Sequence, residues 1–382
     1  MAESQVAGGS IGHVLVTGGC GFLGHHIVRL LRLRDPESRI SVLDLNTNRN
    51  ILAAEGIKYY NGDISSRESI EGVFAKLEYG KVDVVIHTIS PPFHLGKELQ
   101  WSVNVEGTKN LLEVAKGAGV KAFVYTSSAS VIMDNSMVLV NADERWPIMV
   151  DNDQPEYYST TKVIQFQMET AYAEHAVLEA NRNPEGFLTA AIRPAAIFGE
   201  GDVQLIPPMM HASRAGQSKV QIGDNTNLFD YTYVGNVAHA HLLAASALLR
   251  TRAMATAPLD NEKVDGEAFF ITNDQPVYFW DFPRMLWKET GDVRTAKEIW
   301  VLSYSMAWFI GLLMETVMWI LGKTPKLTRQ QVLKSTMTRF FNIDKAKRRL
   351  KYRPVVSLDD GIRRAAKWWL EQEALEQQKK SQ

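Results

Sequence analysis

The amino-terminal half of the chain alternates short apolar runs with longer amphipathic segments. Apolar runs that stop at glycine or polar residues predict strands at residues 13–18, 40–44, 57–63, 82–87, 122–127 and 188–193. Apolar residues that recur with helical periodicity predict helices at residues 23–34, 104–118 and 156–180. Because strands alternate with helices, the pattern favours a parallel, doubly wound α/β sheet.

The pattern changes after Pro194. Two loop-rich stretches, an apolar helix and a polar exposed loop are predicted at residues 199–204, 216–229, 234–249 and 252–266. We therefore predict a first domain at residues 1–198, to which 229–249 returns, and a smaller C-terminal lobe at 199–382. Such a lobe would cover the carboxyl ends of the strands, where open α/β sheets bind ligands.

Composition excludes several classes of protein. The 382 residues carry 42 Lys and Arg against 43 Asp and Glu, and the formal charge of −1 gives no global attraction to nucleic acid. A hydrophobic content of 45% predicts a folded globular protein. The one cysteine excludes a disulfide framework, and the nine histidines form no HExxH or HxxxH pair, which argues against a metal enzyme. The first ten residues do not resemble a signal peptide, so we expect the chain to start in the cytosol.

A glycine-rich loop, TGGCGFLG at residues 17–24, joins the first predicted strand to the first helix. Gly18 permits a tight turn, Gly21 lets the backbone approach a pyrophosphate, and Gly24 lets helix and strand pack closely. The helix then presents its free amino-terminal N–H groups to an anion. The GxxGxxG spacing predicts a phosphate-binding loop, and the alternative is a glycine-rich turn without a ligand.

Two carboxylates are candidate partners for the rest of a dinucleotide. Asp44 ends the second strand, where a carboxylate accepts hydrogen bonds from the adenosine ribose hydroxyls and repels a 2′-phosphate. We therefore predict NAD, with NADP as the alternative because Arg49 lies close enough in sequence to reach a phosphate. The other interpretation of Asp44 is a strand-end turn residue. Asp63 is predicted at the adenine edge or, equally, at the N-cap of a helix, and Cys20 is expected only to fill the loop.

Tyr158 and Lys162 are four residues apart on a predicted helix, so their side chains share one face. A nearby ammonium lowers the pKa of a phenol, which is otherwise near 10. A tyrosine in that state accepts the proton of a substrate hydroxyl while hydride leaves for a nicotinamide. Ser128, just past the fifth strand, is the third predicted catalytic residue, with Ser127 as the reserve.

From about residue 12 to 370 the sequence resembles the extended short-chain dehydrogenases. The motifs that carry the likeness are TGGCGFLG (17–24), Asp44, NVEGT (104–108), VYTSSAS (124–130), YSTTK (158–162) and RPAAIFGEGD (193–202). Within these enzymes it is most similar to the 3β-hydroxysteroid dehydrogenase branch and its fungal sterol-4α-carboxylate 3-dehydrogenases (decarboxylating). This narrower likeness rests on HTISPP (87–92), FDYTYVGNVAHAHLLA (229–244), ITND (271–274), FWDF (279–282) and the tail at 341–369.

The resemblance implies a Rossmann fold and the NAD-dependent oxidation of a sterol 3β-hydroxyl to a ketone, with loss of CO2 from a 4α-carboxysterol. The alternatives are a 3β-hydroxysteroid or triterpenoid dehydrogenase without decarboxylation, a sugar-nucleotide epimerase and a non-catalytic cofactor sensor. The resemblance also implies that Ser128, Tyr158 and Lys162 are the catalytic residues. The implied cofactor-binding residues are Gly18, Gly21, Phe22, Gly24, Asp44, Asp63, Thr88, Tyr158, Lys162 and Pro194. His87, Asn104 and Tyr233 are expected to be structural.

An apolar segment at residues 299–321 contains one formal charge, Glu315, and the stretch 323–353 that follows has eleven basic residues against one acidic residue. Basic residues beside an apolar helix suit anionic headgroups. Because Glu315 is costly in lipid and the chain must return to the fold, we predict an in-plane membrane contact at the mouth of the substrate site. The alternative is a buried core helix. We expect the enzyme on the cytosolic face of the endoplasmic reticulum, with a sterol or triterpenoid substrate, no nucleic-acid partner, and a homodimer or sterol-demethylation complex as its assembly.

Overall fold

The computed structural model describes residues 10–91, 95–132, 138–148 and 162–380. In this part of the chain the largest sheet has seven strands, all parallel, in the order β12-β7-β5-β4-β1-β2-β3. The strands are β1 His13–Thr17, β2 Arg39–Asp44, β3 Ile57–Asn61, β4 Val84–His87, β5 Ala122–Thr126, β7 Leu188–Pro194 and β12 Glu267–Ile271. The strand order reverses between β1 and β4, and ligands of such sheets bind at the carboxyl ends of the strands beside that point.

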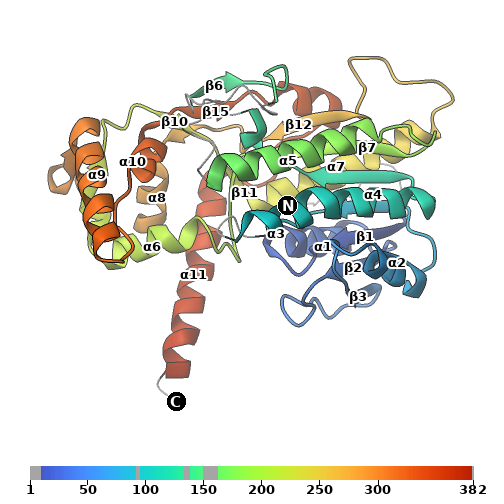
Figure 1. Cartoon of the computed structure of the whole chain (residues 1–382), viewed down its shortest axis with the longest axis horizontal. Helices are drawn as coiled ribbons and strands as arrows, with labels where there is room; N and C mark the ends of the chain where they lie inside the picture. The colour runs from blue at the N-terminus through green and yellow to red at the C-terminus, as the bar shows by residue number, and fades with distance from the viewer. Residues whose placement is uncertain (1–9, 92–94, 133–137, 149–161, 381–382) are drawn as a thin grey trace.

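Helices cover both faces of this sheet (Figure 1). Val14 and Val16 point to the face covered by α1 and α7, whereas Leu15 points to the face covered by α2, α4 and α5. The helices are α1 Phe22–Arg34, α2 Arg67–Lys76, α4 Thr108–Gly117, α5 Lys162–Glu179 and α7 Val234–Ala253. A short helix, α3 Lys97–Trp101, continues through a π-helical turn at Ser102–Gly107 into α4.

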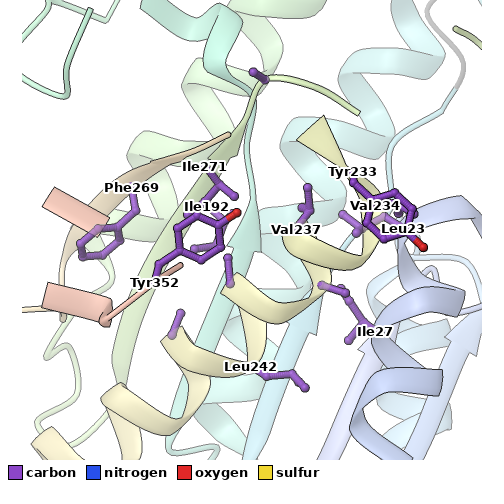
Figure 2. Packing of buried hydrophobic residues seen from close by; sticks show 14 of the residues in the cluster. Leu23, Ile27, Ile192, Tyr233, Val234, Val237, Leu242, Phe269, Ile271 and Tyr352 are labelled. Atoms are coloured by element: carbon purple, nitrogen blue, oxygen red, sulfur yellow. The ribbon is translucent and has the colours of Figure 1, made fainter. Parts of the chain in front are cut away.

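The core on the α1 side also includes residues from near the end of the chain (Figure 2). Tyr352 is fully buried in the same cluster as Ile192 of β7 and Ile271 of β12. Its hydroxyl donates to Thr272 O at 2.8 Å. The tail therefore packs against the large sheet, as expected for a segment that must return to the fold after residue 321.

Shorter elements build the rest of the described chain. A second sheet has the order β13-β10-β15-β6, and two-stranded pairs join β11 to β8 and β14 to β9. These strands are β6 Leu139–Ala142, β8 Ala196–Phe198, β9 Val220–Ile222, β10 Leu228–Phe229, β11 Tyr231–Tyr233, β13 Val277–Tyr278, β14 Trp300–Leu302 and β15 Arg339–Phe341. The helices are α6 Ile206–Arg214, α8 Asp281–Glu289, α9 Tyr304–Ile320, α10 Arg329–Thr336 and α11 Leu358–Lys380. Figure 1 shows α6, α8, α9 and α10 gathered at one end of the molecule, away from β2 and β3.

The predicted doubly wound sheet is confirmed, and each of the six predicted strands is present. The prediction missed β12, because its five residues follow a polar loop and carry no alternation that separates a strand from a buried helix turn. It was also wrong in giving only loop at 216–229, where β9 and β10 pair with distant strands. The helix predicted from residue 156 is described from Lys162 onward, and the division at residue 198 stays a prediction.

Candidate functional site

The loop after β1 is held in shape by its own backbone. Gly18, at φ +76°, donates its N–H to Leu43 O at 2.7 Å, and Gly21 N–H donates to Gly18 O at 2.9 Å. A Cβ atom at Gly24 would lie 2.1 Å from Gly18 O, so only glycine lets the first turn of α1 pack this closely on the loop. The close packing predicted at Gly24 therefore leaves no room for a side chain at that position.

The amino terminus of α1 fits a phosphate group. Its N-cap is Gly21, the described residues give it no side-chain cap, and its first turn has no acidic residue. The first N–H groups of any α-helix lack intrahelical partners, so those of Phe22, Leu23 and Gly24 are left to an anion. The Phe22 ring packs edge-on against His26, with 5.9 Å between the ring centres.

Asp44 ends β2 beside this loop and is 7% exposed. One carboxylate oxygen accepts the Cys20 N–H at 3.0 Å and the other accepts the Asn46 N–H at 3.1 Å. Each oxygen keeps a second lone pair for a ribose hydroxyl. Burial, together with the Asp44 charge, raises the pKa of the Cys20 thiol to about 11, so this cysteine stays a neutral filler of the loop.

The next predicted cofactor residues follow strands at the same edge of the sheet. Thr88, just past β4, donates both its N–H and its hydroxyl to Thr17 O, at 3.1 and 2.8 Å. Pro194 is buried at the end of β7. Their roles in cofactor binding stay predictions.

Asp63 lies at this edge after β3 and is exposed. Its Oδ1 accepts the Ser65 N–H and hydroxyl at 2.9 and 2.7 Å. The interpretation of Asp63 as the N-cap of the following helix is wrong, because α2 begins at Arg67 and Ser66 is its cap. Placement at the adenine edge stays a prediction.

Ser128 lies just past β5, at the same edge of the sheet. Its Oγ accepts the Ser130 N–H at 3.2 Å and donates to Ser130 Oγ at 3.1 Å. The reserve candidate Ser127 is 6% exposed, and its Oγ is buried without a partner among the described residues. Ser128 is half-buried, and its hydroxyl is therefore the more accessible of the two.

The two other predicted catalytic residues are only partly placed. Lys162 is the first residue of α5, which packs against β7 and the π-helical turn. Tyr158 and the side chain of Lys162 lie outside the described residues. Their role stays a prediction.

A chain of hydrogen bonds behind the loop ties β1, β4 and the π-helical turn together. His87 Nδ1 lies 2.6 Å from Thr17 Oγ1, its Nε2 lies 3.0 Å from Thr108 Oγ1, and Thr108 donates to Asn104 O at 2.6 Å. Because burial lowers the pKa of His87 to about 3, the ring is neutral and both of its nitrogens are used within the fold. Tyr233 is also tied to the fold, since its hydroxyl donates to Glu200 Oε2 at 2.8 Å. These contacts agree with the structural roles expected of His87, Asn104 and Tyr233.

Sequence reasoning missed one contact at the site. Arg339 of β15 donates from Nη2 to Ser130 Oγ at 2.8 Å, beside the Ser128 hydroxyl. The sequence pattern placed Arg339 in the basic stretch 323–353. In the structure the members of that stretch have different partners. Other members pair with acids within the fold, as Arg329 does with Glu315 at 2.7 Å and Lys345 with Glu267 at 2.7 Å. The sequence contains only a weak indication of this contact, because only the third serine of TSSAS suggests an additional polar group near Ser128.

The apolar segment 299–321 forms β14 and α9. One stripe of α9 is largely exposed, at Met306 (54%), Phe309 (63%), Leu313 (54%), Val317 (41%) and Ile320 (70%). Trp300, Val301, Trp319 and Leu321, before the helix and at its end, are exposed as well, and we call these nine residues together the apolar face. The interpretation as a buried core helix is wrong, because only Ala307 and Gly311 of α9 are buried. In the described part of the chain, no helix combines the length and the apolar character needed to cross a bilayer.

Glu315 does not lie on the apolar face. It is one turn of helix beyond Gly311, on the side of α9 that packs against α10. Its Oε1 accepts the Arg329 N–H at 2.8 Å, and its Oε2 accepts Arg329 Nε at 2.7 Å. The one acid of the segment is thus neutralised behind the exposed stripe.

The chain is similar to proteins of one enzyme family. The model of the 3-beta hydroxysteroid dehydrogenase/isomerase family matches residues 15–303. The sterol-4-alpha-carboxylate 3-dehydrogenase (decarboxylating) of Saccharomyces cerevisiae is 40% identical over 364 residues, which cover 94% of this chain and 98% of that protein. The human enzyme of the same name is 35% identical, over 91% of this chain and 86% of its own length.

Solved structures of another activity share the fold. The dTDP-glucose 4,6-dehydratase of Bacillus anthracis, crystallised with NAD, has a TM-score of 0.64 and 18% sequence identity, covering 95% of this chain and 98% of that one. At this identity the likeness concerns the fold alone. It supports the predicted Rossmann-type sheet and does not distinguish among substrates.

Proposed function

The chain belongs to the 3-beta hydroxysteroid dehydrogenase/isomerase family, and we propose that it oxidises the 3β-hydroxyl of a 4α-carboxysterol to the 3-ketone, with NAD as hydride acceptor and with loss of CO2. The observation that carries this proposal is the 40% identity to the yeast enzyme of that activity over 94% of the chain. Sugar-nucleotide epimerases share the fold, but at 18–20% sequence identity their likeness to this chain is confined to the fold.

The residues at the sheet edge fit NAD. The uncapped amino terminus of α1 would bind the pyrophosphate, and the buried Asp44 would accept hydrogen bonds from the adenosine ribose. Thr88 follows β4 and Pro194 ends β7, and both strands lie on the side of the reversal point away from β2 and β3, where the nicotinamide would bind. When bound there, NAD supplies a hydride acceptor. NADP remains the alternative cofactor, because a phosphate on the ribose would lie near both Asp44 and Arg49.

In the proposed oxidation, the chain's own residues move one proton. Lys162 stabilises the Tyr158 phenolate, which takes the proton of the substrate 3-hydroxyl as hydride leaves C3. The Ser128 hydroxyl, which donates to Ser130 Oγ in the structure, turns to donate a hydrogen bond to the same oxygen and orients it. These are the roles predicted from the YxxxK spacing and from the position of Ser128 after β5.

The second half of the reaction needs no additional group. Oxidation at C3 places a carbonyl one carbon from the carbon that bears the carboxylate. The bond from C4 to the carboxyl carbon then breaks, CO2 leaves, and the electron pair moves to the C3 oxygen as an enolate. A hydrogen bond from Ser128 or Tyr158 stabilises that oxygen until C4 takes up a proton.

One experiment tests the whole proposal. The purified enzyme is incubated with NAD and a 3β-hydroxysterol whose 4α-carboxyl carries a carbon label, and NADH and labelled CO2 are followed together. We expect one CO2 per NADH. A 3-keto product that keeps its carboxyl would favour the alternative, a steroid or triterpenoid dehydrogenase without decarboxylation, and absence of NADH formation would contradict the dehydrogenase itself.

The apolar face supports a further part of the proposal. The stripe of exposed Met, Phe, Leu, Val and Ile side chains on α9 fits the acyl region of a bilayer, where an amphipathic helix lies in the plane of the membrane. Exposed Lys323 and Lys326 follow at the end of α9, where they would meet anionic headgroups. We therefore propose that the enzyme works on the cytosolic face of the endoplasmic reticulum and takes its sterol from that membrane.

A further inference from the structure

A half-buried arginine, Arg339, lies beside the Ser128–Ser130 pair, and a second half-buried cation lies near that arginine. The guanidinium carbon of Arg339 lies 6.0 Å from the centre of the Phe229 ring and 5.7 Å from that of Phe341, so aromatic rings flank the side chain. Its Nη2 donates to Ser130 Oγ. Lys334, at the end of α10, is the second cation, and Arg339 is close enough to lower its pKa, an effect that adds to the larger effect of burial.

These two cations have no strong counter-charge in the described part of the chain. No acidic side chain described there forms an ion pair with Arg339 or Lys334 within 4.0 Å. The acid that attracts Arg339 is Asp230, whose Oδ2 accepts the Phe341 N–H and whose Oδ1 is buried without a described partner. Burial raises the pKa of Asp230 to about 7, so this carboxyl is only partly ionised at neutral pH.

Arg339 itself keeps its charge. Burial lowers its pKa to about 10, which still leaves the guanidinium protonated at neutral pH. Charges that are removed from water in proteins are ordinarily paired, because desolvation of an unpaired ion is unfavourable. The site therefore has an excess of positive charge that an anionic ligand group would balance.

The position of this charge matches the proposed substrate. Hydrogen bonds of 3.1 and 2.8 Å link Ser128 to Ser130 and Ser130 to Arg339, so the guanidinium is two hydrogen bonds from the group that would contact the 3-oxygen. In a 3β-hydroxy-4α-carboxysterol the hydroxyl and the carboxylate are on adjacent carbons. A side chain that binds the carboxylate must therefore lie close to the one that binds the hydroxyl.

We propose that Arg339, assisted by Lys334, binds the 4α-carboxylate and makes the enzyme select carboxysterols over neutral 3β-hydroxysterols. This inference rests on the proposed function and adds the residues that recognise the acid. The planar guanidinium suits a carboxylate, to which it donates two parallel hydrogen bonds. When CO2 leaves, the negative charge moves to the 3-oxygen beside Ser128, where Arg339 remains close through Ser130.

The test compares the carboxysterol with its methyl ester, which has nearly the same shape and no charge. For each protein, the ratio of kcat/KM for the acid to that for the ester is measured during NADH formation. Affinities of both compounds for the complex of the enzyme with NADH are measured by titration. Because loss of one partner of a desolvated charge pair is strongly unfavourable, we expect Arg339→Met to lower the acid-to-ester ratio about 100-fold.

Further variants keep the result interpretable. Arg339→Lys keeps the charge and should restore part of the preference, and Lys334→Met should lower it by a smaller factor. Arg348→Met, at an exposed arginine of the same basic run, is the matched control and should leave the ratio unchanged. Circular dichroism and the affinity for NADH show whether each variant is folded.

The outcomes separate this inference from the proposed function. If wild-type enzyme does not prefer the acid to the ester, the inference is wrong. It is also wrong if kcat/KM for the acid and for the ester falls by the same factor in both Arg339 variants, because Arg339 then acts only through the serines. If wild type binds the acid in preference to the ester, and Arg339→Met removes that preference, the inference stands. It stands even where no NADH forms, a result that would contradict the proposed oxidation alone.

Discussion

The nucleotide edge of the large sheet and the substrate end of the molecule, which Ser130, Arg339, α10 and α9 form, reach their chemistry by different routes. At the nucleotide edge, residues of a single β1–α1–β2 unit make the site: Gly21 N–H donates to Gly18 O, and the Asp44 carboxylate accepts a backbone N–H of the loop. At the other end, Ser130 meets an arginine 209 positions away, and Glu315 is neutralised from a different helix. A local motif leaves little freedom for substitution, whereas distant contacts allow the substrate end to diverge over a constant cofactor loop.

This difference implies that the two ends can be changed separately. Substitutions in the glycine loop should alter cofactor affinity, and substitutions around Arg339 or the apolar face should alter the choice of sterol and its delivery. The proposed catalytic residues join the two ends, because they must contact both the nicotinamide and the sterol.

Tyr158→Phe should give the largest effect. Loss of the proton acceptor should lower kcat by about 10³-fold, the middle of the range for general acid–base catalysis, while NAD affinity changes little. Oxidation and CO2 release should fail together, because decarboxylation needs the ketone. Stopped-flow or steady-state NADH formation, with NADH titration as the folding control, measures both quantities. Near-normal turnover by Tyr158→Phe would overturn the assignment.

The apolar face should account for most membrane binding. Two charges at Phe309 and Leu313, both more than half exposed, would prevent burial of two large side chains in lipid. We expect Phe309→Glu with Leu313→Glu to lower binding to vesicles of phosphatidylcholine and phosphatidylserine about 100-fold.

Sedimentation with these vesicles measures that binding. Leu259→Glu with Leu375→Glu is the matched control, since both leucines are exposed and lie outside the apolar face. Turnover of a detergent-solubilised sterol should stay at the wild-type level in the double variant. Wild-type protein that does not sediment with vesicles would contradict the membrane proposal.

Gly24→Ala should disrupt the nucleotide edge without touching the other end. A methyl group 2.1 Å from Gly18 O forces the loop and helix apart, and we expect the unfolding free energy to fall by about 2 kcal/mol. NADH affinity should fall as well, because the N–H groups of α1 lose their alignment. Gly72→Ala, in α2, is the control, since its Cβ would have no atom within 4 Å and alanine favours the helix. Urea unfolding compares the two, and equal stability would contradict the steric argument.

The same contrast explains what could be predicted from the sequence. Gly18, Gly24 and Asp44 were identified because their function depends on spacing along a strand, a turn and a helix, which a sequence displays directly. Arg339 was misassigned to a surface because nothing near it in sequence reveals the rings of Phe229 and Phe341 or the hydroxyl of Ser130. In the same way, Glu315 suggested a costly charge in the apolar segment, because its partner Arg329 lies on the next helix and is not apparent from the sequence. Contacts of this kind are decided by tertiary packing, which residue patterns record only weakly.

Asp44→Asn should give the smallest effect and tests the nucleotide edge alone. The amide keeps an acceptor oxygen and nearly the same size but removes the charge that would repel a 2′-phosphate. We expect the preference for NAD over NADP, measured as a ratio of kcat/KM, to fall about tenfold, with the acid-to-ester preference unchanged. Asp44→Ala should weaken NAD binding further, because it also removes the acceptors of the Cys20 and Asn46 N–H groups. If wild type prefers NADP, the carboxylate does not select the cofactor. Arg49→Gln would then be expected to lower NADP use, and the nucleotide edge would depend on an exposed loop residue as well as on its local motif.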